Sequence, residues 1–340
     1  MDKEISKSIS VYDNSFDYLR LYVALLVFYG HACAHLELAE IPYFNLFRLT
    51  VPVFFMLSGF WAVRSYEKSK SVGNYYKKRL TRIYPELLLL IVVNFLIITL
   101  GFGFRPGFID SVIYFFTQTF AMNFYTGAWL RPYGVGAPNG SLWTIPVTIQ
   151  FYLFMPLIWK IIKKTDFKKD IVLFVSAILM GIIGNVGFDY VFGAESIITK
   201  LFHQTLVGYL YIFLIGIYFF KYFDVFKTFL SFRFSWLIIP IYTLLMFIDF
   251  SGISKYLGSY NSVVIILQSF FVFWIGYRLG KHRIKYEISY EIYLVHMIFI
   301  NILVELGYMG SYGILLLSLA LTIITSFLLH YVNSKIVKRL

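Results

Sequence analysis

The stretch 16–35, FDYLRLYVALLVFYGHACAH, places an acid, a base and two histidines inside an apolar run. At about 100° per residue on an α-helix, Arg20 and His31 lie within about 20° of each other, with Asp17 and His35 about 40° to either side. An imidazole changes charge near neutral pH, and ionisable groups inside membrane helices usually face a bundle interior or a wet cavity. One face of this helix could therefore handle protons. The alternative is a pair of interfacial charges and a histidine that is hydrogen-bonded to a neighbouring carbonyl.

The composition indicates that this helix belongs to a membrane protein. Of the 340 residues, 59% are hydrophobic and only 14% are charged, and the mean hydropathy is +0.73, far from the balance of a soluble domain. The single cysteine, Cys33, excludes an intramolecular disulfide framework and a multi-cysteine metal site, and we expect it to pack rather than to react. The polar first fifteen residues do not resemble a signal peptide, so we expect them to be retained.

Ten apolar runs of about twenty residues predict ten transmembrane helices. They lie at 16–36, 46–66, 86–104, 143–162, 171–190, 203–221, 233–250, 261–280, 288–308 and 313–335. A further apolar segment, 111–124, is short and rich in hydroxyl groups, so we expect an interfacial or re-entrant helix there. The predicted fold is an all-α polytopic bundle in which residues 1–340 form one integral-membrane domain, with no soluble extracytoplasmic domain.

The distribution of basic residues predicts the orientation of these spans. With the N-terminus in the cytoplasm, 24 of the 30 Lys and Arg residues fall in cytoplasmic segments, whereas the opposite side holds Arg105, Arg131, Lys200 and Lys255. This bias is the one expected for ten spans with both termini in the cytoplasm. It also accounts for the net charge of +12, so we expect the lipid bilayer, and no nucleic acid, as a partner.

Two further features bear on how the bundle is built. The longest outer loop, 105–142, is rich in glycine and proline turns, and we expect a loop of this length to cap a cavity. The Ser58-Gly59 pair in the second span predicts a close contact between two helices. We find no internal repeat of broken helices, which argues against a transporter built from inverted halves.

Five motifs stand in order along the chain: FDYLRLYVALLVFYGH at 16–31, VPVFFMLSGF at 51–60, KKRLTRIYP at 77–85, NGSLWTIP at 139–146 and SYEIYLVH at 289–296. Together they resemble the acyltransferase 3 family of integral membrane acyltransferases, while the middle spans match it only in hydropathy. The resemblance implies a ten-span enzyme of the bacterial inner membrane. It would move an acyl group, most often acetyl from acetyl-CoA, onto a sugar hydroxyl of a cell-surface polysaccharide or its lipid-linked precursor.

Acyl transfer to an alcohol needs a base for the hydroxyl proton, a grip on the donor and hydrogen-bond donors for the oxyanion. The resemblance implies that His31 is the general base, and we place Asp17 and Arg20 of the same helix in the catalytic set. Arg79 and Arg82 stand near the cytoplasmic mouth of the third span, where their guanidinium forks could hold the phosphates of coenzyme A. Ordinary cytoplasmic positive charge is the alternative for these two arginines.

Two groups of polar residues could bind the glycan acceptor. Asn139, Ser141 and Trp143 stand where the outer loop re-enters the membrane and could orient a sugar, although a turn followed by an interfacial tryptophan explains them nearly as well. Tyr293 and His296 are three residues apart on the ninth span and share a face, so they could line the same cavity. A structural histidine is an equal alternative for His296. We expect no metal ion, and a homo-oligomer is compatible with the sequence.

The chain departs from the family pattern at two places, and these departures bear on acceptor specificity more than on the fold. Relatives commonly carry Glu shortly after the Leu-Trp motif, but here 147–150 is VTIQ, and Glu291 stands where a small residue is frequent. Glu86 could pair with Arg82 one turn earlier.

The sequence leaves three hypotheses for the function. The first is a glycan O-acetyltransferase. The second is a related protein that uses another acyl group such as succinyl or exports an acylated small molecule, and the third is a non-catalytic membrane scaffold.

Overall fold

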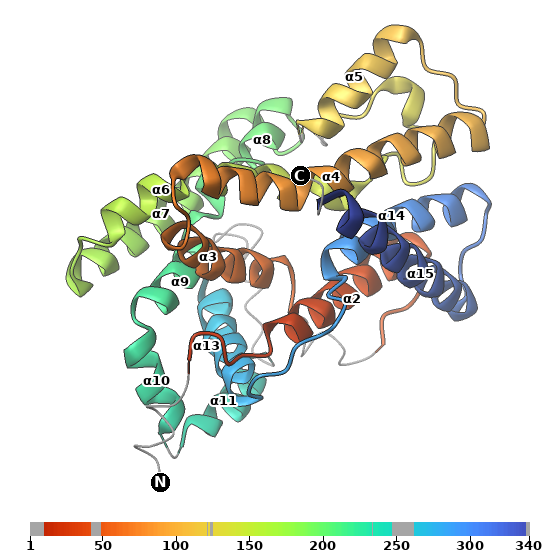
Figure 1. Cartoon of the computed structure of the whole chain (residues 1–340). Coiled ribbons are helices and arrows are strands. Elements are labelled where there is room, and N and C mark those ends of the chain that lie inside the picture. Colours follow the sequence, from red (N-terminus) through yellow and green to blue (C-terminus); the bar gives the residue numbers. More distant parts are fainter. Residues whose placement is uncertain are drawn as a thin grey trace. The chain divides into compact units, whose positions relative to one another are not determined.

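The computed structural model describes residues 10–41, 49–120, 122, 125–232, 234–246 and 262–337. Every regular element among these residues is a helix, as Figure 1 shows, which confirms the predicted all-α class. The chain forms two compact units. The first consists of Met1–Arg20, Asn45–Tyr76 and Val147–Ile284, and the second of Leu21–Phe44, Lys77–Pro146 and Lys285–Leu340.

The helices are assigned to the units by their residue ranges. The first unit holds α3 (Val51–Glu67), α7 (Phe167–Phe192), α8 (Ile197–Phe202), α9 (Leu210–Lys221), α10 (Phe223–Ser231), α11 (Ile238–Met246) and α13 (Ser262–Arg278). The second holds α5 (Phe108–Thr119), η4 (Gly140–Trp143), α14 (Ser289–Glu305) and α15 (Tyr312–Val337). The unit boundaries fall inside α2 (Phe16–His35), α4 (Val72–Leu96) and α6 (Thr144–Ile162).

Several helices have the length and composition of membrane spans. Four stretches of the described chain qualify: Val72–Gly101, Gly140–Ile162, Phe167–Phe192 and Tyr312–Lys335. Phe223–Leu230 and Ser235–Leu244, bent by 95°, would add a fifth if they form one broken span. The structure therefore supports a membrane protein with four or five such spans, while the count of ten and the cytoplasmic placement of both termini stay predictions.

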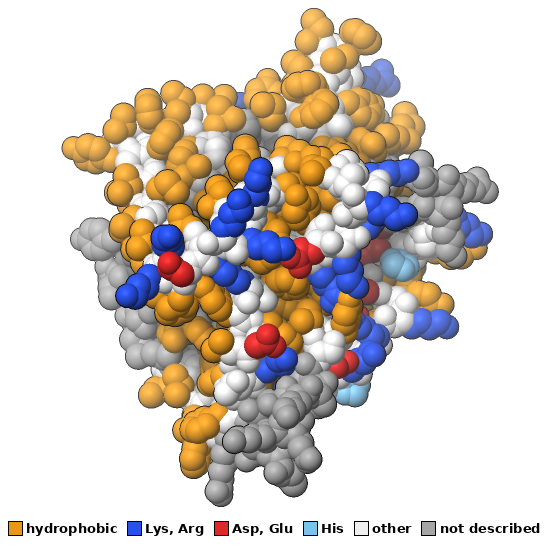
Figure 2. Space-filling model, turned by 60° about the vertical axis from the view of Figure 1, so that its left-hand side comes forward, with side chains coloured by type: hydrophobic (Ala, Val, Ile, Leu, Met, Phe, Trp, Pro, Cys, Tyr) orange, Lys and Arg blue, Asp and Glu red, His pale blue; other side chains and the backbone are white. Residues whose placement is uncertain are grey.

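The surface of the protein is suited to lipid. Hydrophobic side chains cover large parts of the face shown in Figure 2, above all its upper part, while Lys, Arg, Asp and Glu side chains gather across its middle. On α7, for example, Val172, Val175, Leu179 and Ile183 are all exposed at intervals of three or four residues. A helix of 26 residues whose apolar side chains face outward at this spacing is what a lipid-facing wall requires.

Two of the apolar runs differ from continuous spans. The run at 203–221 is not one continuous helix, because residues 203–209 form turns and the short helix η5 (Leu206–Gly208) and α9 begins only at Leu210. The segment at 111–124 gives α5, a helix of 12 residues that rises about 18 Å and so falls short of a bilayer core of about 30 Å. A short interfacial or re-entrant helix fits α5 better than a span does; residues 121, 123 and 124 lie outside the described part.

The core of the first unit is held by a close approach of α3 and α9. A Cβ atom added at Gly59 would lie 2.1 Å from the carbonyl oxygen of Phe213, and one added at Gly216 would lie 1.8 Å from that of Met56. The two backbones therefore meet where each helix lacks a side chain, as small residues allow in membrane bundles. The close helix contact predicted at Ser58-Gly59 is confirmed.

In the second unit the C-terminal half of α2 packs against α14. Phe28 and Ala32 of α2, together with Leu36 just after its end, form one buried cluster with residues of α14, namely Met297, Ile300 and Leu303. These positions recur every three or four residues on both helices, so each helix presents one apolar stripe to the other. α14 also packs along α15. This packing fixes the rotation of α2 and α14 and thereby the direction in which their polar residues point.

Candidate functional site

A pair of histidines joins α2 and α14 inside the second unit. Nδ1 of His31 lies 2.8 Å from Nε2 of His296. The ring planes are 8° apart and the ring centroids are 5.1 Å apart. Since the two nitrogens are much closer than the centroids, the rings meet edge to edge in nearly one plane, the alignment that an N–H···N hydrogen bond requires. The structure thus brings together the histidines of the first and last motifs.

His296 is fixed on α14 by its own helix and by aromatic neighbours. Its Nδ1 lies 2.9 Å from the carbonyl oxygen of Ile292, one turn earlier. The rings of Phe28 and Tyr293 flank it, with centroids 6.4 Å and 6.0 Å away. The side chain is fully buried, whereas His31 is half-buried. His31 is therefore the member of the pair that a substrate can approach.

Asn139 and Ser141, predicted to touch the acceptor, are bound to the backbone of α14. Asn139 Nδ2 donates to the carbonyl oxygen of Leu294 at 2.7 Å, and its Oδ1 accepts from the Ser141 hydroxyl at 2.6 Å. Both side chains are buried. Trp143 ends the short helix η4 and is half-buried. These bonds give Asn139 and Ser141 a structural task, namely holding the entry to α6 against α14.

Tyr293, next to the histidine pair, also forms hydrogen bonds with the segment around Ser141. Its hydroxyl lies 2.8 Å from Oγ1 of Thr144 and also donates to the carbonyl oxygen of Ser141. Tyr293 and His296 share a face of α14, as their spacing predicts, and their rings are neighbours. The start of α6 and the middle of α14 are therefore joined by side-chain hydrogen bonds at the level of the histidines.

The loop before η4 is bound to the C-terminal half of α14. The backbone N–H of Gly134 donates to Oε2 of Glu305 at 2.8 Å, and that of Val135 donates to Oδ1 of Asn301 at 2.9 Å. Burial raises the pKa of Tyr133, and the carboxylate of Glu305 raises it further, so this phenol stays neutral. The side chains of α14 satisfy loop backbone groups that would otherwise be costly to bury.

Asp17 and Arg20, the other predicted catalytic residues, lie in the first unit. Oδ1 of Asp17 is 3.9 Å from Nη1 of Arg20, and Oδ2 is 3.3 Å from Nη1 of Arg283. Arg283 also donates to the carbonyl oxygen of Tyr12. The Asp17 carboxylate therefore stands between two guanidinium groups, a local arrangement that suffices to place these charges. A catalytic role for Asp17 and Arg20 stays a prediction.

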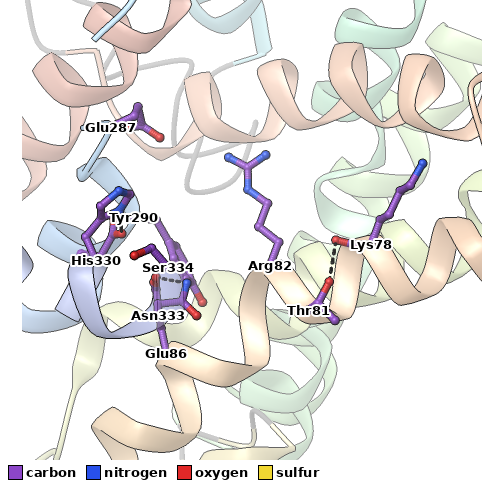
Figure 3. Close-up of a pocket in the computed structure, with 10 residues that line it drawn as sticks. Lys78, Thr81, Arg82, Glu86, Glu287, Tyr290, His330, Asn333 and Ser334 are labelled. Atoms are coloured by element: carbon purple, nitrogen blue, oxygen red, sulfur yellow. Dashed lines mark hydrogen bonds and ion pairs between the residues drawn. The ribbon is translucent and has the colours of Figure 1, made fainter. Parts of the chain in front are cut away.

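A polar cavity of about 440 Å³ opens elsewhere in the second unit, between α4, α14 and α15 (Figure 3). Its lining combines cations, acids and neutral polar groups. It consists of Lys78, Thr81, Arg82, Glu86, Glu287, Tyr290, Glu291, His330, Asn333 and Ser334. Arg82 is exposed and reaches from α4 toward the open space in Figure 3. Arg79, one turn earlier and half-buried, is not among the described residues that line the cavity.

Two buried acids form the floor of this cavity, and both are bound to α15. Glu86, 2% exposed, accepts a hydrogen bond from Asn333. Oε1 of Glu291, 3% exposed, lies 2.5 Å from Nδ1 of His330. The hydrogen bond to Glu86 thus comes from an amide of the last helix, while Arg82, the partner that the sequence suggested, interacts with Glu86 through its charge. Burial of a carboxyl group is tolerated when such hydrogen bonds are made.

His330 and Asn333 were missed in the sequence. Both are polar residues inside the last apolar run, and they stand three positions apart on one helical face. Intramembrane polar residues usually face a bundle interior, so this signal could have marked them. Their partners could not be named, because Glu86 and Glu291 lie on helices far away in the sequence.

Gln150 ends the VTIQ segment at 147–150, which follows the fourth motif and holds no acid. Its Nε2 donates to the carbonyl oxygen of Gln204 at 2.8 Å, and its Oε1 accepts from the backbone N–H of Leu206 at 2.9 Å. The Gln150 amide therefore satisfies one backbone carbonyl and one backbone N–H in the stretch between α8 and α9. A carboxylate, which only accepts, could not make both bonds.

Comparison with known proteins relates this chain to membrane acyltransferases, as the five motifs suggest. The profile of a family described as an acyltransferase domain matches residues 13–331. Nodulation protein 10 of Rhizobium leguminosarum bv. viciae is 33% identical over 166 residues, 44% of this chain and 44% of that protein. Acyltransferase MdmB of Streptomyces mycarofaciens is 26% identical over 160 residues, 44% of this chain and 40% of that protein.

The aligned segments thus span less than half of either relative, and no solved structure gives a significant match. The family profile, in contrast, covers nearly the whole chain, including all five motifs and both histidines of the pair. The chain belongs to the acyltransferase 3 family.

Proposed function

We propose that this protein is an O-acyltransferase of the bacterial inner membrane that transfers an acetyl group from acetyl-CoA to a sugar hydroxyl of a surface polysaccharide or its lipid-linked precursor. The observation that carries the proposal is the arrangement of α14. Glu291 on this helix lines the polar cavity, and His296, five residues later, binds His31. Five residues correspond to about 7.5 Å along the helix axis.

The cavity is the proposed site of the donor. Arg82 and Lys78 supply positive charge at its exposed side, and a guanidinium can bind a phosphate through two parallel hydrogen bonds. The flexible pantetheine arm would then run along α14 toward the histidine pair. Lys78 and Glu287 belong to segments that the positive-inside rule assigns to the cytoplasm, and Ser334 stands at the predicted cytoplasmic end of the last span, which is the side where acetyl-CoA is made available.

The reaction needs one proton acceptor and returns the proton at the end. His31 takes the proton of the sugar hydroxyl as its oxygen attacks the thioester carbonyl carbon. The tetrahedral intermediate collapses, the carbon–sulfur bond breaks, and the coenzyme A thiolate takes the proton from His31. The products are the sugar ester and free coenzyme A, and no metal ion or redox cofactor takes part in this scheme.

The acceptor would arrive from the side of the long outer loop. The loop residues Gly134 and Val135 are bound to Glu305 and Asn301 in the C-terminal half of α14, and Trp143 ends η4 farther along the same segment. Asn139 and Ser141 would act mainly by holding this entrance in shape, because their polar atoms already bind α14. Neutral hydroxyl and amide groups in this region suit an uncharged sugar.

A genetic complementation experiment tests this function. A deletion strain is complemented with wild type, with His31→Ala or with His282→Asn, and its surface polysaccharide is analysed by mass spectrometry. His282 is an exposed histidine of the first unit, so it controls for loss of an imidazole. We expect wild type and His282→Asn to restore the acetyl ester, and His31→Ala to restore almost none, because loss of a general base costs about 10²–10⁴ in rate.

Two results would contradict the proposal. Full restoration by His31→Ala, at equal protein level in the membrane, would remove His31 from the reaction. A polysaccharide that is unchanged by the deletion would remove the glycan as acceptor. A mass difference of succinyl instead of acetyl would leave the acyl transfer intact and replace the proposed donor.

A further inference from the structure

The hydrogen-bond partners of His296 determine which of its nitrogens carries a proton. Nδ1 lies 2.9 Å from the carbonyl oxygen of Ile292. A carbonyl oxygen can only accept a hydrogen bond, so Nδ1 must be the protonated nitrogen. In a neutral imidazole the other nitrogen, Nε2, is then an acceptor.

A neutral His296 is the form that its surroundings favour. The ring is fully buried. Among the described residues, its neighbours are His31, the backbone of Ile292 and Tyr293, the rings of Phe28 and Tyr293 and, farther away, His35; none of these groups is a carboxylate. A buried charge without a partner of opposite sign costs several kcal/mol, so a cationic His296 is disfavoured.

The same reasoning then assigns the proton of His31. Nε2 of His296 accepts, and the atom 2.8 Å away is Nδ1 of His31. That nitrogen must be the donor, because two acceptors at this distance would repel. Neutral His31 therefore carries its proton on Nδ1, and its lone pair is on Nε2. The order of donors runs from His31 through His296 to the backbone of α14.

We propose that His296 is a positioning residue that holds His31 in its Nδ1–H tautomer, so that Nε2 is the atom that accepts the proton of the sugar hydroxyl. This inference rests on the proposed function, in which His31 is the general base. The carbonyl of Ile292 orients His296, which in turn orients His31. The arrangement corresponds to the base and its orienting group in a hydrolase triad, with a neutral imidazole in the place of the carboxylate.

The pair also stabilises the charged state that forms during the reaction. When Nε2 of His31 takes a proton, the ring becomes an imidazolium and both of its nitrogens donate. Its Nδ1–H already points at the acceptor nitrogen of His296, so no reorganisation is needed as the charge develops. A hydrogen bond from a charged donor is roughly twice as strong as one between neutral groups.

Two substitutions of similar size separate this role from simple packing. In His296→Asn, the side-chain amide reaches the place of Nδ1 and can still donate to Ile292, but it is too short to accept from His31. In His296→Gln, the amide oxygen can reach the place of Nε2 and accept from His31. We expect kcat to fall about 10- to 100-fold in His296→Asn, by analogy with the loss of the hydrogen-bond partner that orients a metal-bound histidine, and to recover substantially in His296→Gln.

The tautomer itself can be measured without turnover. Nitrogen NMR of the full chain, labelled with ¹⁵N-histidine in lipid nanodiscs, shows which ring nitrogen carries a proton, and the His31 signals are those that disappear in His31→Ala. We expect Nδ1–H for His31 in wild type and in His296→Gln, and Nε2–H or a mixture in His296→Asn. The exposed control His282→Asn should change neither the His31 signals nor kcat, and the KM for acetyl-CoA should stay the same in every variant.

The outcomes distinguish this inference from the proposed function. An Nε2–H tautomer of His31 in wild type overturns the inference, even if the protein is an active acetyltransferase. A wild-type kcat in His296→Asn overturns it as well. A wild type that has the Nδ1–H tautomer but transfers no acetyl group to polysaccharide from the deletion strain would instead overturn the proposed function.

Discussion

Nδ1 of His31 lies 2.8 Å from Nε2 of His296, although 265 residues separate the two in the sequence. The contact depends on the packing of α2 against α14, in which Phe28 and Ala32 of one helix face Met297 and Ile300 of the other. Apolar stripes on either side of the pair thus set its geometry. In the proposed reaction His296 acts only through His31, so substitutions of the two histidines should not have independent effects on the rate.

The first prediction is that the effects of the two histidines are not additive. If His296 acts only through His31, His31→Ala combined with His296→Asn should be about as slow as His31→Ala alone, as in catalytic units whose members act together. The measurement is kcat for acetyl transfer in all four members of the cycle. Independent losses that multiply in the double variant would show that His296 acts by another route.

The second prediction concerns the donor cavity. Arg82→Ala should weaken binding of a non-hydrolysable acetyl-CoA analogue roughly 10- to 100-fold, because a hydrogen bond to a charged group contributes about 1.5–3 kcal/mol. Arg82→Lys should restore little, since a point charge does not reproduce the guanidinium fork. Isothermal titration of the purified protein measures the Kd directly.

The control for the donor cavity is Arg131→Ala, an exposed arginine outside the described lining of the cavity, which should bind the analogue as wild type does. His31→Ala should also bind normally, because the proposed base does not hold the donor phosphates. Normal binding by Arg82→Ala would mean that Arg82 does not hold the donor and serves only as positive charge on the cytoplasmic side of the membrane.

The third prediction tests the close contact of α3 and α9. Gly59→Ala and Gly216→Ala would each push a methyl group against a backbone carbonyl oxygen, at 2.1 Å and 1.8 Å. Overpacking of this kind costs typically about 1–3 kcal/mol, so the thermal midpoint of unfolding in detergent should drop. Gly101→Ala, whose added Cβ would meet nothing within 4 Å, is the matched control and should change the midpoint little.

The fourth prediction concerns topology and rests on the asymmetry of the basic residues. In a Cys33→Ala background, single cysteines in place of Lys70, Lys164 or Lys285 should resist an impermeant thiol reagent applied to intact cells, whereas one in place of Glu195 should react. All four positions are exposed in the structure, so burial cannot explain a lack of labelling. Labelling of Lys164→Cys but not of Glu195→Cys would invert the orientation predicted for α7.

The sequence by itself determined the all-α class, the lipid-facing character of the surface and the family. Each of these follows from local properties: hydropathy along a run, the helical period that puts Arg20 and His31 on one face, and motifs of up to sixteen adjacent residues. The close contact at Gly59 could also be predicted, because a small residue inside a span signals approach of another backbone.

Only the tertiary structure decided which faces meet. The helical period shows that His296 and Tyr293 share a side of α14, but it does not show which helix lies opposite. Glu86 illustrates the limit: the spacing suggests Arg82 on the same helix, and the charge of Arg82 does act on Glu86, but only the structure shows the hydrogen bond from Asn333 of α15. Long-range packing of apolar stripes selects such partners, and the sequence pattern of any one helix does not contain the rotation and height at which its neighbour docks.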